Sequence, residues 1–244
     1  KTKDELEKQG YWLSEGNIFT KGKDKYVPLY EGKMVQMFDH RAATVVVNPD
    51  NVSRPAAPSI TSIDKHKDIC YSPLPQFWVP LTEVERRLSS NSPAWLIGFK
   101  DVTAPTNERS MISCILRRTG LGNTLPAIMS DNATNASLPA CLLANICSFC
   151  LDYTARQKIG GQHLNFFIVE QLPIFPPEKY GRKFKGVVVK DFIARRVLEL
   201  TYTGKDIQAF SNDLGYKGEP FKWDEERRLH LRCQLDALLF HLYS

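Results

Sequence analysis

Residues 138–177 read LPACLLANICSFCLDYTARQKIGGQHLNFFIVEQLPIFPP, and this stretch predicts the element around which the chain folds. Pro139, close behind Ser137, favours a helix that begins there, with the serine as its N-cap. The apolar residues that follow recur at helical spacing and form one stripe: Leu142, Leu143, Ile146, Phe149, Cys150 and Tyr153. Gly160 and Gly161 should end the helix, because glycine readily adopts the left-handed conformation found at helix ends. We therefore expect a buried helix that presents a polar loop.

The whole chain has 244 residues, of which 43% are hydrophobic and 24% charged, as is ordinary for a globular protein. This length can bury a substantial core without disulfides or metals. The formal net charge of +5 permits an anionic partner but does not require one. No signal peptide and no apolar run of membrane-spanning length is visible, so we expect no membrane association and a cytoplasmic location. The chain begins on Lys1 without a methionine, and we expect it to be a fragment of a longer protein.

Strand patterns dominate the first half of the chain and helix patterns the second half. The patterns predict a hairpin over 11–19, strands over 44–47, 77–80, 94–102, 108–117 and 125–129, and helices over 82–88, 187–201, 206–213 and 225–244. We expect Thr82 and Asp224 to cap the first and last of these helices, and Asp152 to pair with Arg156 four residues later. Residues 48–67 contain several prolines without periodicity and predict a long surface loop. The fold class is therefore α+β, a mixed and largely antiparallel sheet flanked by helices, with a helical C-terminal extension. We place one domain at 1–177 and the extension at 178–244.

Enzyme motifs are weak in this sequence. Cys147 and Cys150 form a C-x-x-C without a second pair at metal-ligand spacing, so they are expected to be core residues. The G-x-G at residues 120–122 lacks both the third glycine and a following helix. A metal-dependent nuclease built on Asp24, Glu31 and Lys33 is the alternative that superficially fits an E-x-K pattern.

Several loops instead combine glycine, a basic residue and an amide or aromatic residue. They lie at residues 30–33, 40–41, 107–109 and 158–165. Arginine, lysine, histidine, asparagine and glutamine are the side chains that contact phosphates and base edges, and glycine lets a backbone approach a phosphate closely. Each loop alone could simply be solvated, but together they favour a binding module over a catalyst.

Four blocks of this sequence resemble the specificity region of type IIG restriction-modification DNA methyltransferases. The blocks lie at residues 28–41, 95–110, 152–173 and 235–243, occur in order and span nearly the whole chain. The sequence departs from the family at Lys100, Ser110 and Gln234, where arginine, threonine and glutamate are common. In such enzymes the region follows the methyltransferase domain and recognises the DNA target, while the catalytic domain holds a flipped adenine.

The resemblance implies a bacterial or archaeal parent that methylates adenine N6 in a restriction-modification or phage-defence system. S-adenosylmethionine would bind the missing N-terminal methyltransferase domain, since the Asn-Pro-Pro-Tyr motif is absent here. The expected partners are double-stranded DNA and that domain, and we assign no catalytic, cofactor-binding or metal residue to this chain. The expected DNA contacts are Lys33, His40, Arg41, Arg109, Lys158, Gln162, His163 and Asn165.

Within that set we expect lysine and arginine mainly on phosphates, and Gln162 or Asn165 nearer the base edges. Asp152, Tyr153, Trp95 and Asp101 should brace the site. Two alternatives stay open: the nuclease named above, and a scaffold domain that docks a partner subunit through its C-terminal helices.

Overall fold

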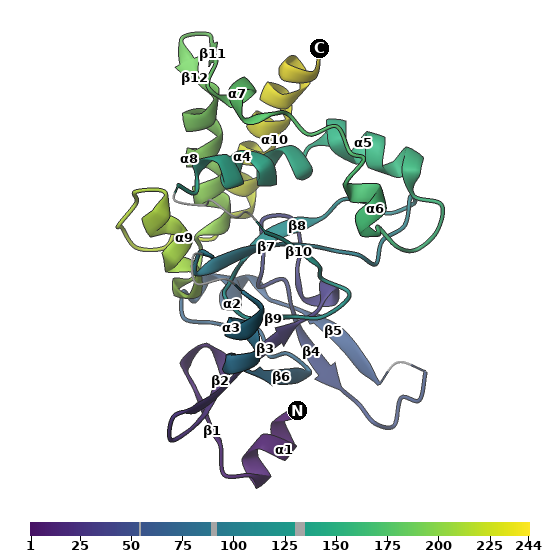
Figure 1. Cartoon of the computed structure of the whole chain (residues 1–244), viewed down its shortest axis with the longest axis vertical. Helices are drawn as coiled ribbons and strands as arrows, with labels where there is room; N and C mark the ends of the chain where they lie inside the picture. Colours follow the sequence, from purple (N-terminus) through teal and green to yellow (C-terminus); the bar gives the residue numbers. More distant parts are fainter. Residues whose placement is uncertain (54, 89–91, 130–134) are drawn as a thin grey trace.

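The computed structural model describes residues 1–53, 55–88, 92–129 and 135–244 (Figure 1). It is a mixed α+β structure with 40% helix and 21% strand, and its sheets are antiparallel apart from one short pairing. The predicted fold class is confirmed. In Figure 1 most strands lie in the half that holds the N-terminus, and most of the long helices gather in the half that holds the C-terminus.

The larger sheet has the order β1-β2-β3-β6, formed by β1 (Trp12–Ser14), β2 (Ile18–Lys21), β3 (Asp24–Tyr30) and β6 (Phe77–Pro80). β1 and β2 form the hairpin that the sequence predicted over 11–19. The two-residue strand β9 (Gly120–Leu121) pairs in parallel with β3. α1 (Lys3–Lys8) precedes this sheet, and α3 (Leu81–Arg87) follows β6.

A second sheet has the order β10-β7-β8, with β7 (Trp95–Phe99) in the centre, β8 (Ser113–Arg117) on one side and β10 (Ala127–Ile128) on the other. All five residues of β7 are buried, as expected for its continuous apolar sequence. The predicted strand over 108–117 is confirmed only in its second half. Residues 100–112 form a connection that carries one of the predicted binding loops.

The predicted surface loop over 48–67 is wrong in part. β5 (Ala56–Ile60) pairs with β4 (Ala43–Val47) in a two-stranded ribbon, and α2 (Ile63–Lys67) follows, capped by Ser62. Pro58 hides the strand from sequence patterns, because proline is rare within central strands but is tolerated in a ribbon with free edges.

The single helix expected after Ser137 is two helices, α4 (Ser137–Ile146) and α5 (Phe149–Lys158), bent by 57°. Ser148 causes the break: its hydroxyl donates to the carbonyl of Asn145 and accepts from the backbone N–H of Leu151. A serine that caps a new helix in this way ends the preceding one. The bend turns α5 toward the short helix α6 (Phe166–Val169).

The C-terminal third contains α7 (Pro177–Tyr180), the hairpin β11 (Lys183–Phe184) and β12 (Val187–Val188), then α8 (Val189–Thr201), α9 (Gln208–Asp213) and α10 (Glu225–Tyr243). Short 3-10 turns η1 (Glu15–Asn17), η2 (Gly32–Met34) and η3 (Lys205–Ile207) complete the list of helical elements. Asp224 caps α10 as predicted, since its side chain accepts from the N–H of Arg227.

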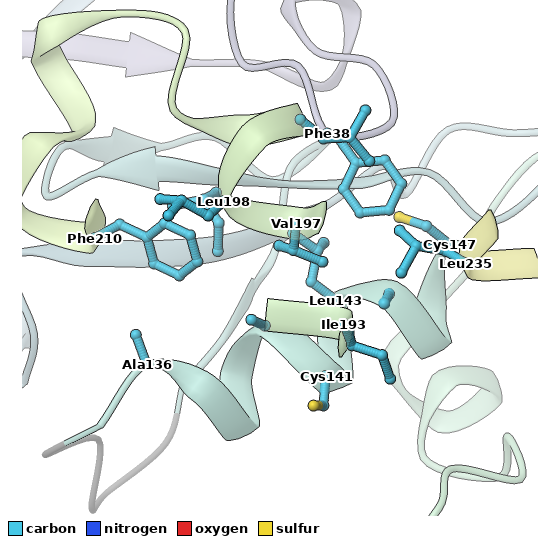
Figure 2. Close-up of a cluster of buried hydrophobic side chains, with 14 of the residues drawn as sticks. Phe38, Ala136, Cys141, Leu143, Cys147, Ile193, Val197, Leu198, Phe210 and Leu235 are labelled. Atoms are coloured by element: carbon cyan, nitrogen blue, oxygen red, sulfur yellow. The ribbon is translucent and has the colours of Figure 1, made fainter. Parts of the chain in front are cut away.

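One hydrophobic cluster joins residues from both sides of the predicted boundary at 177/178. Figure 2 shows Ile193 and Val197 of α8 beside Leu143 of α4, with Phe38 and Leu235 near the same centre. All five side chains are at most 3% exposed. The C-terminal helices therefore complete the core of the first 177 residues, although the sequence suggested a separate extension.

Within the part of the chain that the structure describes, no single helix is both long and apolar enough to cross a membrane. α4 and α5 meet the criterion of length and apolarity only when taken together. Most residues of α4 are buried, whereas α5 is buried along one face only.

Candidate functional site

Two of the predicted DNA contacts, His40 and Arg41, lie inside the protein, with exposures of 1% and 0%. The Arg41 guanidinium donates to the carbonyls of His66 at 2.9 Å, Asp68 at 2.8 Å and Thr203 at 2.8 Å. His40 shares a hydrogen bond of 2.8 Å with Asp206. Both side chains brace the fold, because the two terminal nitrogens of the guanidinium and Nε2 of the imidazole are bound by the chain itself. We therefore remove them from the candidate site.

Arg109 also points inward. Its side chain is 10% exposed, donates to Asp236 of α10 at 3.3 Å and lies over the ring of Phe149 at 3.3 Å. A guanidinium that stacks on an aromatic ring and pairs with a partly buried carboxylate is a typical structural contact. Arg109 thus ties the 100–112 connection to two helices, and we remove it from the DNA contacts as well.

The side chain of Lys33 is bound by nearby residues of the protein. Its ammonium lies 3.3 Å from Glu31 and donates to the carbonyl of Ala56 at 3.2 Å, and the side chain is 24% exposed. The loop around it packs tightly: a Cβ on Gly32 would overlap the carbonyl oxygen of Thr124. The N–H of Gly32 also donates to the Thr124 hydroxyl at 3.0 Å. Lys33 therefore lies at the margin of the candidate site.

The remaining four candidates are exposed and lie together on residues 158–165, which we call the Gly-Gly loop. They are Lys158, Gln162, His163 and Asn165. The loop begins at the last residue of α5 and ends at the N-cap of α6. Two buried residues, Ile159 and Leu164, anchor it in a small cluster that also contains Phe99. The anchors fix both ends, so the polar side chains between them are presented to solvent.

Three contacts attach the Gly-Gly loop to the 100–112 connection. Asp101 accepts from the backbone N–H of Leu164 at 2.7 Å through its carbonyl, and its carboxylate lies 2.6 Å from Nδ1 of His163. The N–H of Thr103 donates to the carbonyl of Gln162 at 2.9 Å. His163 is 58% exposed while Asp101 is 14% exposed. The carboxylate thus orients the imidazole and leaves its outer side accessible.

Asp152 of α5 organises the rest of the 100–112 connection. Its carboxylate accepts from the backbone N–H groups of Ser110 at 2.6 Å and Met111 at 2.8 Å, and from Arg156 at 2.7 Å. Arg156 in turn donates to the carbonyls of Pro105 at 2.8 Å and Glu108. The predicted Asp152–Arg156 pair and the bracing role of Asp152 are confirmed. Tyr153, expected to brace the site, is instead 69% exposed.

The loop around Lys33 adjoins the same surface. The N–H of Asp101 donates at 3.1 Å to the carbonyl of Thr124, the residue whose hydroxyl holds Gly32. Lys100 lies between them, and burial lowers the pKa of its ammonium. Asp101 therefore contacts the Gly-Gly loop directly and reaches the loop around Lys33 through Thr124.

The charge along the Gly-Gly loop has one sign. No aspartate or glutamate occurs between Asp152 and Glu170, whereas Arg156, Lys158 and His163 all lie in that interval. The two glycines leave the backbone open to an approaching ligand. A Cβ built on Gly160 or Gly161 meets no described atom within 4 Å. Neither glycine is among the residues with positive φ, so the expected left-handed helix end is wrong and α5 ends at an extended Ile159. The fold does not require glycine here.

Sequence patterns missed two exposed aromatic residues directly after the loop. Phe166 and Phe167 are 53% and 60% exposed, and Val102 beside His163 is 48% exposed. The available signal was two adjacent phenylalanines immediately after a polar run, because a four-residue helix cannot bury both.

The structure does not bring together the residues that the nuclease alternative requires. Asp24 and Glu31 lie at opposite ends of β3, roughly 20 Å apart at about 3.3 Å per residue, and so cannot share a metal ion. Among the described residues no group of three or more histidine, cysteine, aspartate or glutamate side chains is placed to hold a metal. All six cysteines are free, and burial raises the pKa of Cys147 to about 12, so the thiol is unsuited to nucleophilic chemistry.

The G-x-G at residues 120–122 is also structural. Gly120 lies in β9, where Val79 and Leu29 crowd its α-carbon, and the N–H of Gly122 donates to the carbonyl of Tyr30 at 2.8 Å. These residues fit a sheet contact and do not form a turn that could cradle a phosphate.

Comparison with family models, with curated proteins and with solved structures finds no match to this chain.

Proposed function

We propose that this chain is the double-stranded DNA recognition domain of an adenine-N6 DNA methyltransferase in a restriction-modification or phage-defence system. One observation carries the proposal: four exposed candidates predicted from sequence lie on one acid-free loop, and Asp101 attaches that loop to the 100–112 connection. The resemblance of the four sequence blocks to type IIG enzymes supplies the methyltransferase context.

The interface has two kinds of contact. The ammonium of Lys158 makes one long hydrogen bond, of 3.4 Å, to the amide oxygen of Gln171. It contacts the phosphate backbone of the duplex. His163, held by Asp101, and the amides of Gln162 and Asn165 contact base edges in the major groove. S-adenosylmethionine belongs to the methyltransferase domain of a longer parent, and this chain has no part in holding it.

The test is binding of the 244-residue chain to duplexes of random sequence, followed by fluorescence anisotropy between 50 and 200 mM salt (on the order of the range over which counterion release is measured). The logarithm of the affinity should fall linearly with the logarithm of the salt concentration. Lys158→Ala should reduce that slope by about 0.9, the contribution of one phosphate contact.

Lys3→Ala is the matched control, because Lys3 is about half exposed on α1, at the other end of the molecule (Figure 1). It should leave the slope unchanged. Absence of salt-dependent duplex binding by the unaltered chain, or equal changes in both variants, would refute the proposed function.

The docking alternative cannot be tested by cutting the chain after Pro177, because that cut would remove half of the main cluster. α8 and α10 supply Ile193, Val197 and Leu235 to a core that also contains Leu143. Loss of a partner by such a fragment would therefore report unfolding, and substitutions on exposed positions of α10, such as Phe240→Ser, are the appropriate test.

A further inference from the structure

Phe166 and Phe167 form a pair of exposed aromatic rings at the end of the Gly-Gly loop. Their exposed fractions, 53% and 60%, contrast with those of their helix neighbour Ile168 and of Leu172 beyond it, each 7% exposed. Single large apolar side chains are common on protein surfaces, but two adjacent ones next to a candidate binding loop suggest a surface that is covered in use.

Contacts with the protein interior fix the position of the two phenylalanines. Phe166 makes an edge-to-face contact with Phe99 of the central strand β7, with ring centroids 5.6 Å apart and planes at 89°. Ile168 and Leu172 anchor the segment in the same cluster as Phe99. The amide of Gln171 donates to the carbonyl of Phe167 at 2.8 Å, and its oxygen accepts from Lys158. The rings therefore project from a support that is fixed at both ends.

The charges around the pair favour a polyanion over an acidic or apolar protein surface. Asn165, His163 and Lys158 precede the rings, and the interval from Asp152 to Glu170 contains no carboxylate. Asp101, the acidic side chain in contact with the loop, is paired with His163, and Glu170 follows one turn after Phe166. Aromatic rings bordered by cations and amides are the composition with which proteins contact both the bases and the backbone of DNA.

We propose that Phe166 and Phe167 act as a wedge that enters the base stack of duplex DNA while the Gly-Gly loop contacts its phosphates and base edges. This inference rests on the proposed function. Phe167, the more exposed ring, is the part that enters the stack, while Phe166 packs on Phe99 of β7. Insertion unstacks one base step and unwinds the duplex locally, and stacking of the ring on a base compensates for the lost base–base contact.

Plasmid unwinding tests the wedge without knowledge of the target sequence. A closed circular plasmid is relaxed by a topoisomerase in the presence of the 244-residue chain, and the linking number is read on a gel after the protein is removed. Unwinding by an inserted ring should lower the linking number in proportion to the bound protein.

Phe167→Ala should bind the duplex about tenfold more weakly, as expected for the loss of one stacked ring, and at equal occupancy should leave the linking number unchanged. Phe167→Trp, which retains a stacking ring, should preserve the shift. Trp12→Ala is the control, because Trp12 is 58% exposed on β1, far from α6 in Figure 1. It should behave as the unaltered chain.

The outcomes separate the two proposals. Failure of the unaltered chain to bind duplex DNA overturns the proposed function and the wedge with it. Salt-dependent binding without any change in linking number, or an equal shift by Phe167→Ala at equal occupancy, overturns the wedge alone. A thermal unfolding curve for Phe167→Ala that matches the unaltered chain excludes misfolding as the cause of a lost shift.

Discussion

Asp236 of the C-terminal helix binds Arg109 at 3.3 Å with one carboxylate oxygen and the backbone N–H of Phe149 at 2.8 Å with the other. Phe149 is the first residue of α5, and α5 carries the Gly-Gly loop at its opposite end. Burial raises the pKa of Asp236 even though the N–H of Phe149 and the charge of Arg109 act against that rise. The C-terminal helix thereby positions the candidate interface without being part of it.

Arg109→Met should cost more stability at pH 7 than at pH 4. Without the guanidinium, the partly buried Asp236 carboxylate has no countercharge, and removing one partner of such a pair costs about 3 kcal/mol. The folded-state pKa of Asp236 lies above its unfolded value, so the folded state binds the extra proton and stability falls as pH rises from about 4. Urea unfolding at both pH values measures the difference, and a cost that is equal at pH 4 and pH 7 would contradict this account.

Arg41→Lys should destabilise the protein strongly while leaving duplex affinity unchanged in the folded fraction. The planar guanidinium donates to three carbonyls in different directions, and one ammonium cannot reproduce that fork. We expect a loss of about 3 kcal/mol, measured by chemical unfolding. Unchanged stability together with weakened DNA binding would restore Arg41 to the interface.

Acid should destabilise the protein through Asp39. Burial alone would raise the pKa of Asp39, but the hydrogen bond to His66 and the charges of His66, Arg228 and His40 outweigh it and lower the pKa. A depressed folded-state pKa means that this contribution is complete above about pH 4 and is lost as pH falls through the folded value. Asp39→Asn should therefore lower the melting temperature at pH 7 and flatten its decline below pH 4; an equally steep decline in the variant would count against Asp39.

Gly160→Ala and Gly161→Ala should weaken duplex binding without reducing stability. Added methyl groups meet no described atom within 4 Å, and neither glycine has a positive φ, so the unfolded chain loses entropy and stability rises by about 0.5 kcal/mol. If the backbone of the Gly-Gly loop lies against a phosphate, as proposed, the added methyl groups will hold the phosphate away. Melting curves and anisotropy on the same samples give both quantities. Binding that survives both substitutions would show that no phosphate lies against this backbone.

Asp101 and His163 should behave as a coupled pair in DNA binding. If Asp101 acts by orienting the imidazole, Asp101→Ala should weaken binding little once His163 is already alanine. A double-mutant cycle of dissociation constants measures the coupling, with about 1 kcal/mol expected for a contact to a charged group. Additive effects would mean that Asp101 acts through the backbone bonds of its loop and that the imidazole is oriented by something else.

Sequence patterns predicted correctly those elements that depend on residues close together in the chain. The hairpin over 11–19, the apolar strand β7, the Asp224 cap and the Asp152–Arg156 pair all follow from residues within a few positions of one another. The break between α4 and α5 was missed because Ser148 sits within an apolar stripe that continues across the bend. Thr82, expected to cap α3, lies inside that helix, which begins after Pro80.

The sequence predicted the exposure of candidate residues correctly only where neighbouring residues in the sequence determine that exposure. The Gly-Gly loop is polar, follows a helix and is exposed. His40, Arg41 and Arg109 have the same residue types in similar contexts, yet their partners Asp206, Thr203 and Asp236 come from the last forty-odd residues of the chain. No local pattern shows that a carboxylate or carbonyl from so far away will cover a cation.

Arg41 has a consequence for the synthesis of the protein. One of its acceptors, the carbonyl of Thr203, is made 162 residues after Arg41 itself. While the ribosome is still adding that intervening chain, the guanidinium cannot leave water without losing a partner. The set of acceptors around this guanidinium is therefore complete only after Thr203, just beyond α8, has left the ribosome.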